Sequence, residues 1–556
     1  MFKRSFIAIS LFALSVLALP LSVHTSSGQE APHRAHVVIL GTTDMHGRIF
    51  PIDYYTNKPD NVGIAKIATL VKEARKNDPN LLLVDCGDTI QGTPLEYFHN
   101  KRNNAPPDPM MLAMSSLRYD AMTVGNHEYN FGMKVLEKAR REAKFPWLSA
   151  NTYNPNVKGD PSNQYTPYII KEVNGVRVGV LGLTTPGIPN WENVPNYEGL
   201  AFKETVSEAK KWVPILRGMG KVDLVAIAMH MGIEEDLRTG TRSPSQVANE
   251  NAAIAIARQV PGVDVILMGH THRDVPSLVV NGVLLTQASR WASHLARIDV
   301  YLEKNGDGRW HVVAKQSRTI PVTEKTALDP EIAQLGQPYD KETQDWLGRR
   351  IGESTEELTS QDCRFRDSAI IDLIQRVQLE AGQADVSMAA CFNPQARIPK
   401  GPVTVREIAG LYEYENTLVT LELTGQQLKD ALEHSARYFR EYQPGKNLNE
   451  LVDNRIPGYN FDMAEGVTYT LDIAKPFGQR IQSLRFKGQP LSPTQKLRVV
   501  TNNYRVNGGG GYAMYKGAPV VYRSSEEVRE LIIDWVEKHQ TIPTQTNSNW
   551  RIVGPP

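Results

Sequence analysis

The chain has 556 residues, which is more than one domain's worth. Hydrophobic residues make up 41% of it and charged residues 22%, a globular composition that excludes a disordered chain or a coiled coil. Lys+Arg 62 and Asp+Glu 61 leave a net charge of +1. Without a basic excess, a nucleic-acid polymer is not expected as a partner.

Residues 1–28 have the pattern of a secretory signal peptide. Lys3 and Arg4 precede an apolar run over 6–21, and small polar residues follow it. The run of about sixteen residues is shorter than the roughly twenty that a membrane-spanning helix needs. We therefore expect a secreted protein, periplasmic or extracellular, without a stable membrane anchor.

Residues 33–325 alternate short β-branched runs with helix-like stretches, which predicts a layered α/β domain. The predicted strands are 37–40, 81–84, 122–124, 176–181, 224–229 and 263–268. The predicted helices include 64–76 and 133–143.

A polar, charged stretch over 326–350 predicts a helical linker to a second domain at 351–556. Within that second block we expect a helix over 368–379, a strand over 418–423 and a helix over 426–435. This mixture of elements indicates an α+β domain.

Potential metal ligands directly follow five of the predicted strands. They are Asp44 and His46, Asp88, Asn126 with His127, His230, and His270 with His272. In α/β sheets, ligands collect outside the carboxyl ends of strands, so separate strands can bring these side chains to one place. Each motif alone is weak evidence for a metal site, because an isolated Asp-x-His is more often a turn or a hydrogen-bonded pair. Their repetition at strand ends is what indicates a metal centre.

The donor types are sufficient for two divalent ions such as Zn, Mn or Co. Carboxylate, imidazole and amide-carbonyl donors form a hard-to-borderline ligand set. Asp44 and Asp88 neutralise only part of the metal charge, so the site stays positive and suits a phosphate dianion. Two neighbouring ions can activate water and hold the phosphate oxygens during in-line attack. We interpret Cys86 as a small buried residue rather than a ligand and Glu128 as structural.

These motifs resemble the calcineurin-like metallophosphoesterases, specifically the exported 5′-nucleotidase and 2′,3′-cyclic-nucleotide phosphodiesterase family. The resemblance implies a four-layer αββα domain joined by a helix to a substrate domain. It also implies that one metal binds Asp44, His46, Asp88 and His272, and that the other shares Asp88 and binds Asn126, His230 and His270. His127 would face the phosphate as a catalytic residue without binding metal.

The second domain carries two motifs of the same family, residues 412–416 and 503–505, the latter before a run of four glycines. By resemblance, Tyr414 and Tyr504 sandwich a nucleotide base, and Asn416 belongs to the same substrate-binding motif. Stacking suits a promiscuous pocket, because every base has a π-face. The alternative interpretation is two ordinary half-buried tyrosines beside a flexible turn.

Three departures separate the chain from typical 5′-nucleotidases. Asn130 stands where those enzymes pair an Asp with the catalytic histidine, and Gly510 stands where they have an Asp that contacts the base. Residues 391–393 replace a stretch with an arginine, which leaves Arg366 and Arg397 as candidates for the phosphate contact. We assign Asn130 a catalytic role as the partner of His127. The departures favour the cyclic phosphodiesterase/3′-nucleotidase branch.

The sequence thus predicts an exported, metal-dependent phosphoesterase that acts on small nucleotides and is expected to be a monomer. One alternative is a 5′-nucleotidase that also hydrolyses nucleotide sugars such as UDP-sugars. Another is a surface protein that binds nucleotides without catalysis, which the complete ligand set disfavours. The family also contains sulfur-oxidation hydrolases, which the tyrosine pair disfavours.

Overall fold

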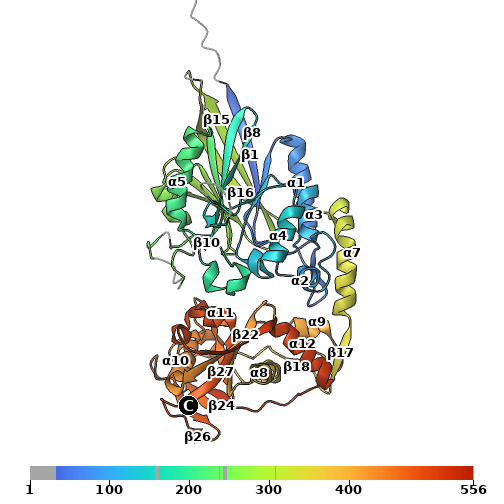
Figure 1. Cartoon of the computed structure of the whole chain (residues 1–556), viewed down its shortest axis with the longest axis vertical. Coiled ribbons are helices and arrows are strands. Elements are labelled where there is room, and N and C mark those ends of the chain that lie inside the picture. The colour runs from blue at the N-terminus through green and yellow to red at the C-terminus, as the bar shows by residue number, and fades with distance from the viewer. Residues whose placement is uncertain (1–32, 157–161, 237, 242–246, 307, 555–556) are drawn as a thin grey trace, which may run out of the picture.

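The structure is a computed structural model that describes residues 33–156, 162–236, 238–241, 247–306 and 308–554. The predicted signal peptide, residues 1–28, lies outside these ranges. Within them, no helix combines the length and the apolar composition that crossing a membrane requires. Figure 1 shows two bodies, one above the other, with helix α7 (Pro330–Leu347) along one side.

Two six-stranded sheets form the first body. The first sheet has the order β16 (Trp310–Pro321), β15 (His294–Lys304), β1 (Arg34–Thr42), β4 (Leu82–Asp85), β5 (Ala121–Thr123) and β6 (Trp147–Leu148). The second has the order β13 (Asp274–Val280), β14 (Val283–Ala288), β12 (Val265–Met268), β11 (Leu224–His230), β9 (Val176–Thr184) and β8 (Tyr168–Val173). Parallel pairs occupy the centre of both sheets.

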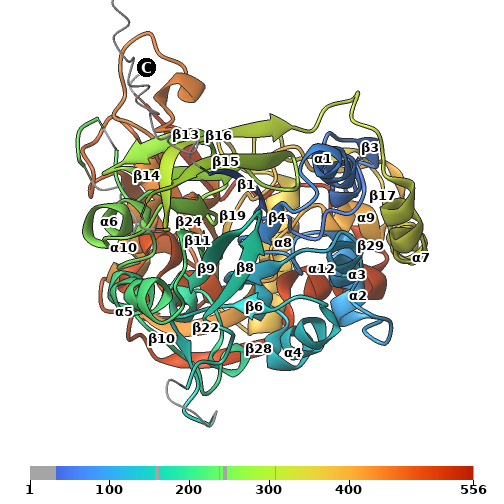
Figure 2. The ribbon, with the colours of Figure 1, turned by 90° about the horizontal axis from the view of Figure 1, so that it is seen from above.

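Three apolar cores separate these layers, and Figure 2 shows the helices on the two outer sides. Val37, Val178 and Ala226 belong to a core between the two sheets. A second core lies between the second sheet and helices α5 (Thr205–Gly218) and α6 (Ala253–Gln259). A third lies between the first sheet and α1 (Ile64–Asn77), α3 (Pro109–Ser116) and α4 (Gly132–Glu142). The expected four-layer αββα domain is confirmed.

Helix α7 lies within the stretch 326–350 that is predicted to be helical, and it begins four residues later, at Pro330. Asp329 caps the first turn by accepting a hydrogen bond from the Ile332 amide, and Pro330 takes the first helical position. The helix is fastened to the first body, because Tyr54 donates to Asp340 over 2.7 Å. The connector is therefore a packed structural element rather than a free tether.

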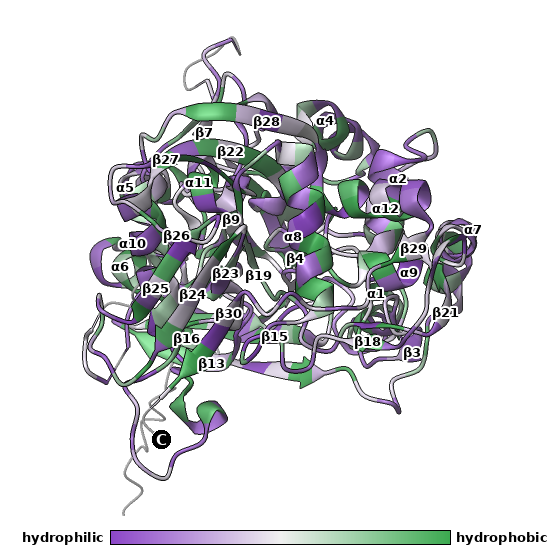
Figure 3. Ribbon diagram, turned by 90° about the horizontal axis from the view of Figure 1, so that it is seen from below, coloured by the Kyte–Doolittle hydropathy of each residue, from purple (hydrophilic) through white to green (hydrophobic). Residues whose placement is uncertain are grey.

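The second body is built around a mixed five-stranded sheet, as an α+β domain should be. Its order is β23 (Asp462–Glu465), β19 (Val386–Ala390), β27 (Lys496–Asn502), β22 (Thr417–Thr424) and β28 (Val520–Glu527). The main helices are α8 (Ala369–Gly382), α10 (Gly425–Ser435) and α12 (Val528–His539). In Figure 3, polar and apolar patches alternate along α8, although most of its side chains are buried.

Three smaller sheets complete the second body, the smallest being the pair β18 (Leu358–Thr359) and β20 (Arg397–Ile398). Another has the order β26 (Gln489–Pro490), β25 (Ile481–Phe486), β24 (Val467–Asp472) and β30 (Trp550–Val553). The third has the order β21 (Gly401–Thr404), β17 (Arg350–Ser354) and β29 (Thr541–Ile542), and β17 receives the chain from α7.

Ion pairs join the two bodies near α2 (Pro94–Lys101). Lys101 lies 3.0 Å from Glu527, and Arg102 lies 3.1 Å from Glu530. Gln91 also donates a hydrogen bond to Glu415. These contacts hold the second body against the edge at which the central strands of the first body end.

Candidate metal centre

The candidate ligands occupy strand ends, as predicted. Asp44 and His46 follow β1, Asp88 follows β4, Asn126 follows β5, His230 ends β11, and His270 and His272 follow β12. Five of these residues have a positive φ, between 48° and 69°, namely Asp44, His46, Asp88, His270 and His272. A positive φ is uncommon outside glycine, and such conformations collect at functional sites.

The structure brings the Asp and His candidates into two groups. In each group the possible ligand atoms lie within 4.8 Å of one another. The first group is Asp44, His46 and His272, and the second is Asp88, His230 and His270.

Short contacts hold both groups together. The Nε2 atoms of His46 and His272 are 3.0 Å apart. The Nε2 atom of His230 is 3.0 Å from Asp88 Oδ2 and 3.1 Å from Asn126 Oδ1, so Asn126 joins the second group. The structure therefore gathers all seven predicted ligands, and the sharing of Asp88 by both metals stays a prediction.

Contacts outside the ligand set orient the imidazoles. His230 Nδ1 lies 2.7 Å from the Cys86 carbonyl oxygen, which requires a proton on Nδ1 and makes Nε2 the nitrogen that can bind a metal after it loses its proton. His46 Nδ1 faces the Gln91 carbonyl at 3.2 Å in the same way. His270 Nε2 is 2.9 Å from Glu250, so its Nδ1 is the free nitrogen. The residues present therefore fit divalent ions.

Cys86 contributes through its backbone. Its thiol is buried, and burial raises the pKa of Cys86 well above the ordinary range, which disfavours a thiolate ligand. Glu128 accepts backbone hydrogen bonds from Asp88 at 3.0 Å and from Gly125 at 2.7 Å. It therefore ties together the two loops that carry Asp88 and Asn126.

Electrostatics favour the ligand forms of Asp88 and His46 but the protonated form of His230. Burial opposes charge on Asp88, but the neighbouring histidines, His230 first, together outweigh it and hold the pKa of Asp88 well below its usual range. Burial and then His272 lower the pKa of His46 to about 3, so its imidazole is neutral. In His230, burial is outweighed by Asp88, which raises the pKa to about 10. A metal must displace that proton, so metal binding competes with protons here.

His127 belongs to neither metal group. Its backbone amide donates to Asp88 Oδ1 over 2.8 Å, and its Nδ1 lies 2.6 Å from Asn130 Oδ1. Burial lowers the pKa of His127, whereas Asp88 and the Asn130 contact outweigh that effect and raise it. The ring centroids of His127 and His46 are 5.4 Å apart, so this histidine stands beside the metal groups.

An aromatic cluster lies on the second body. The rings of Tyr414 and Phe392 are 5.2 Å apart, and those of Tyr414 and Tyr459 are 6.4 Å apart. Tyr504 lies in helix α11 (Asn503–Val506), and burial chiefly, with a smaller effect from Tyr504, raises the pKa of both Tyr414 and Tyr459. The Tyr504 ring also fills the space of any side chain at Gly509, because an added Cβ would lie 2.5 Å from it. Sequence reasoning noted residues 391–393 only as a replaced stretch and so missed Phe392 as a member of this cluster, and no local motif marks Tyr459.

Asn416 braces the loop of this cluster. Its side-chain NH₂ group donates to the Tyr412 hydroxyl over 3.3 Å, and its backbone carbonyl accepts a hydrogen bond from the Val528 backbone amide over 2.8 Å.

The aromatic cluster and the metal groups are linked by direct contacts. Arg290 Nη1 lies 3.2 Å from His272 Nδ1, and burial lowers the pKa of Arg290 while Tyr414 acts in the opposite direction. The rings of Trp191 and His270 are 5.3 Å apart, and Asn503 donates to the Trp191 carbonyl over 3.4 Å. One edge of the first body therefore faces the aromatic cluster of the second.

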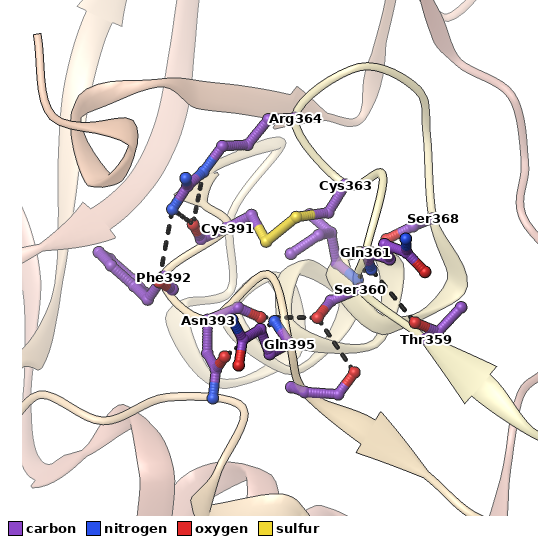
Figure 4. The surroundings of a disulfide bond; sticks show 12 residues. Thr359, Ser360, Gln361, Cys363, Arg364, Ser368, Cys391, Phe392, Asn393 and Gln395 are labelled. Carbon is purple, nitrogen blue, oxygen red and sulfur yellow. Dashed lines mark hydrogen bonds between the residues drawn. A yellow bond between two sulfur atoms is a disulfide. The ribbon is translucent and has the colours of Figure 1, made fainter. Parts of the chain in front are cut away.

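A disulfide joins Cys363 to Cys391, the residue directly before Phe392 of the aromatic cluster (Figure 4). Arg364 donates to the Cys391 carbonyl over 2.8 Å, next to Phe392. The two arginines proposed for phosphate contact are instead exposed, and each is paired with an acid. Arg366 pairs with Asp362 and Arg397 with Glu357. Arg364 is thus the arginine of this segment that lies against the aromatic cluster.

Comparison with known proteins explains this architecture. Residues 37–274 match the family described as calcineurin-like phosphoesterase, and residues 350–517 match the 5′-nucleotidase C-terminal domain. A Staphylococcus aureus structure described as a candidate 5′-nucleotidase superposes with a TM-score of 0.83 at 25% identity, over 94% of this chain and all of the other.

Curated relatives align with nearly the whole of this chain. A Yersinia enterocolitica 2′,3′-cyclic-nucleotide 2′-phosphodiesterase/3′-nucleotidase is 30% identical over 99% of this chain and 92% of its own length. The Bacillus subtilis trifunctional nucleotide phosphoesterase protein YfkN is also 30% identical over 97% of this chain, which spans only 40% of that longer protein. The predicted family is confirmed. The chain belongs to the calcineurin-like phosphoesterases that carry a 5′-nucleotidase C-terminal domain.

Proposed function

We propose that the protein hydrolyses phosphate esters of nucleotides with two divalent metal ions, and that 2′,3′-cyclic nucleotides and 3′-nucleotides are its preferred substrates. The observation that carries the proposal is the placement of two Asp/His groups at one strand-end edge, facing an aromatic cluster. Such an arrangement offers phosphate chemistry on one side and base stacking on the other.

Asp44, His46 and His272 would hold one ion, Asn126, His230 and His270 the other, and Asp88 both. When bound, the two ions supply Lewis acidity and orient the phosphate for attack by water.

The chain's own side chains perform the remaining tasks. His127 stabilises charge on the phosphate or gives a proton from Nε2 to the leaving oxygen. Asn130 holds its ring through the contact at Nδ1. Tyr414 and Tyr504 stack on the base, while Asn416 holds the loop that carries Tyr414.

Support for the cyclic and 3′ branch comes from relatives of that name and from Asn130 in place of an acid. The second candidate is a 5′-nucleotidase that also acts on nucleotide sugars. It is favoured by the structural likeness to a Thermus thermophilus 5′-nucleotidase precursor, with a TM-score of 0.66 at 25% identity. Retention of every predicted ligand argues against a protein that binds nucleotides without hydrolysing them.

The deciding experiment assays the purified protein with Zn²⁺, Mn²⁺ or Co²⁺ against 2′,3′-cyclic AMP, 3′-AMP, 5′-AMP and a UDP-sugar. We expect the highest kcat/KM for the first two substrates. A preference for 5′-AMP would support the second candidate. No hydrolysis of any nucleotide by metal-loaded protein would reject the proposed function.

The finer organisation is also a proposal. We infer a metallophosphoesterase domain over 33–325, a helical linker over 326–350 and a nucleotide-binding domain over 351–556. We also infer export after removal of residues 1–28, and a monomer. Mass spectrometry of the secreted form and light scattering would test these inferences.

A further inference from the structure

A buried carboxylate lies behind the His127–Asn130 pair. Glu192, in the loop between the short helices Ile188–Asn190 and Val194–Asn196, is 7% exposed. Its Oε1 accepts a hydrogen bond from Asn130 Nδ2 over 2.5 Å, and its Oε2 accepts one from Asn196 Nδ2 over 2.9 Å. Each oxygen therefore receives an N–H, which favours the charged form although burial raises the pKa of Glu192.

The carboxylate fixes the direction of the hydrogen-bond chain. An ionised carboxylate only accepts, so the atom of Asn130 that faces Glu192 must be its NH₂ group. The other end of the Asn130 amide, its carbonyl oxygen, then faces His127 Nδ1. An oxygen acceptor at that position requires Nδ1 to carry the proton.

Asn196 supports the same interpretation. Its Nδ2 faces Glu192 Oε2 and also the backbone carbonyl of Asn130 at 3.3 Å. Both of these neighbours are acceptors, so the Asn196 atom between them must be nitrogen. The loop is also held from the second body, since Asn507 donates to the Glu192 carbonyl over 3.4 Å.

We propose that Glu192 is a positioning residue for catalysis, which acts through Asn130 to hold His127 in the Nδ1–H form and to supply the carboxylate that Asn130 lacks. This proposal rests on the proposed function and deepens it. The Nδ1–H form keeps Nε2 as the nitrogen that exchanges a proton with the leaving oxygen. The Glu192 charge polarises the Asn130 amide, so its carbonyl oxygen stabilises positive charge on the ring.

The key variants change which residue of the hydrogen-bond chain His127–Asn130–Glu192 carries the carboxylate. In Glu192→Gln, the new amide can present either its oxygen or its NH₂ group to Asn130. The Asn130 side-chain amide can then rotate by half a turn, and the His127 imidazole is no longer held in one tautomer. We expect kcat to fall about 10- to 100-fold, with KM and metal content unchanged. Asn130→Asp alone puts two carboxylates in contact and also lowers kcat.

The double variant N130D/E192Q is the rescue. The carboxylate introduced at position 130 would accept directly from His127, and the amide introduced at position 192 would donate to that carboxylate, so direction and charge are both restored. We expect kcat at least about tenfold above that of E192Q. The control is Glu198→Gln, the same chemical change at an exposed residue nearby, which should behave as the wild type. A wild-type kcat in E192Q, or a double variant no better than the poorer single variant, would overturn the proposal.

The tautomer can be observed directly. Long-range ¹H–¹⁵N spectra of the zinc-loaded, ¹⁵N-histidine protein distinguish the two neutral tautomers, and comparison with His127→Ala assigns the signal. We expect Nδ1–H in the wild type and in the double variant, and a mixture in E192Q. An Nε2–H tautomer in the wild type would overturn the proposal. This readout needs no turnover, so it decides the role of Glu192 even if the nucleotide assays reject the proposed function.

Discussion

The strand-end edge of the first body and the aromatic cluster of the second are built differently. Asp44 and His230 are fully buried, whereas Tyr414 is 38% exposed and Tyr459 is 37% exposed. The metal groups are held by backbone turns and by hydrogen bonds behind each imidazole. Tyr414 lies on a loop and Tyr459 in a short 3-10 helix, and the ring contacts of Tyr414 are with Phe392 and Tyr459. Phosphate chemistry demands fixed geometry, while base stacking tolerates variation, and this difference predicts which substitutions affect turnover and which affect affinity.

The largest effect is expected at the metal groups. Asp88→Ala removes the carboxylate predicted to bridge both ions and leaves His230 without its 3.0 Å partner. Metal content, measured by elemental analysis, and turnover should both collapse. The exposed acid Asp345→Ala serves as the control and should lose neither. Two bound metals and more than about a tenth of wild-type activity in D88A would refute the bridging role.

The next effect separates catalysis from metal binding at the same edge. His127→Ala removes proton transfer or charge stabilisation but no ligand, so kcat should fall roughly 10²–10⁴-fold at unchanged metal content. As a control, His311→Ala changes an exposed histidine on β16 and should alter neither kcat nor metal content. Loss of metal in H127A would make His127 a ligand instead.

The aromatic cluster should affect affinity more than turnover. Tyr414→Ala or Tyr504→Ala should lose about 1–3 kcal/mol of stacking, which raises KM for nucleotides roughly 5- to 150-fold. The generic ester bis-p-nitrophenyl phosphate, which depends less on a base pocket, should be affected less. Tyr301→Ala is a matched control, because that tyrosine is also 38% exposed but lies on β15. Equal losses on both substrates would mean that the tyrosines only support packing.

The smallest effect on activity is expected from removing the disulfide next to that cluster. The Cys363–Cys391 bridge closes a sequence separation of 28 residues, so replacing both cysteines by serine should cost about 3–4 kcal/mol of unfolding free energy in a chain-entropy estimate. KM should rise only modestly, because the hydrogen bond from Arg364 also holds the Cys391 segment. Urea denaturation and nucleotide kinetics measure the two effects. An unchanged unfolding free energy would show that the bridge does not constrain the chain.

The same contrast explains what the sequence predicted. Strand ends and ligand types are local signals, so helix 64–76 is found at Ile64–Asn77 and strand 418–423 at Thr417–Thr424. The grouping of Asp44 with His272 is a tertiary contact between distant residues, which only the family resemblance implied. Phe392, Tyr459 and Glu192 reach their sites from loops or a short helix without a pattern, so periodicity could not reveal them.

A crystal structure of the zinc-loaded protein with a non-hydrolysable nucleotide, in which anomalous scattering locates the metals, tests the central claim most directly. We predict two metal peaks, both at Asp88, one also at His46 and His272 and the other at His230 and His270. The base should lie between Tyr414 and Tyr504. A single metal peak, or a base bound away from the two tyrosines, would contradict a centre shared between the two bodies.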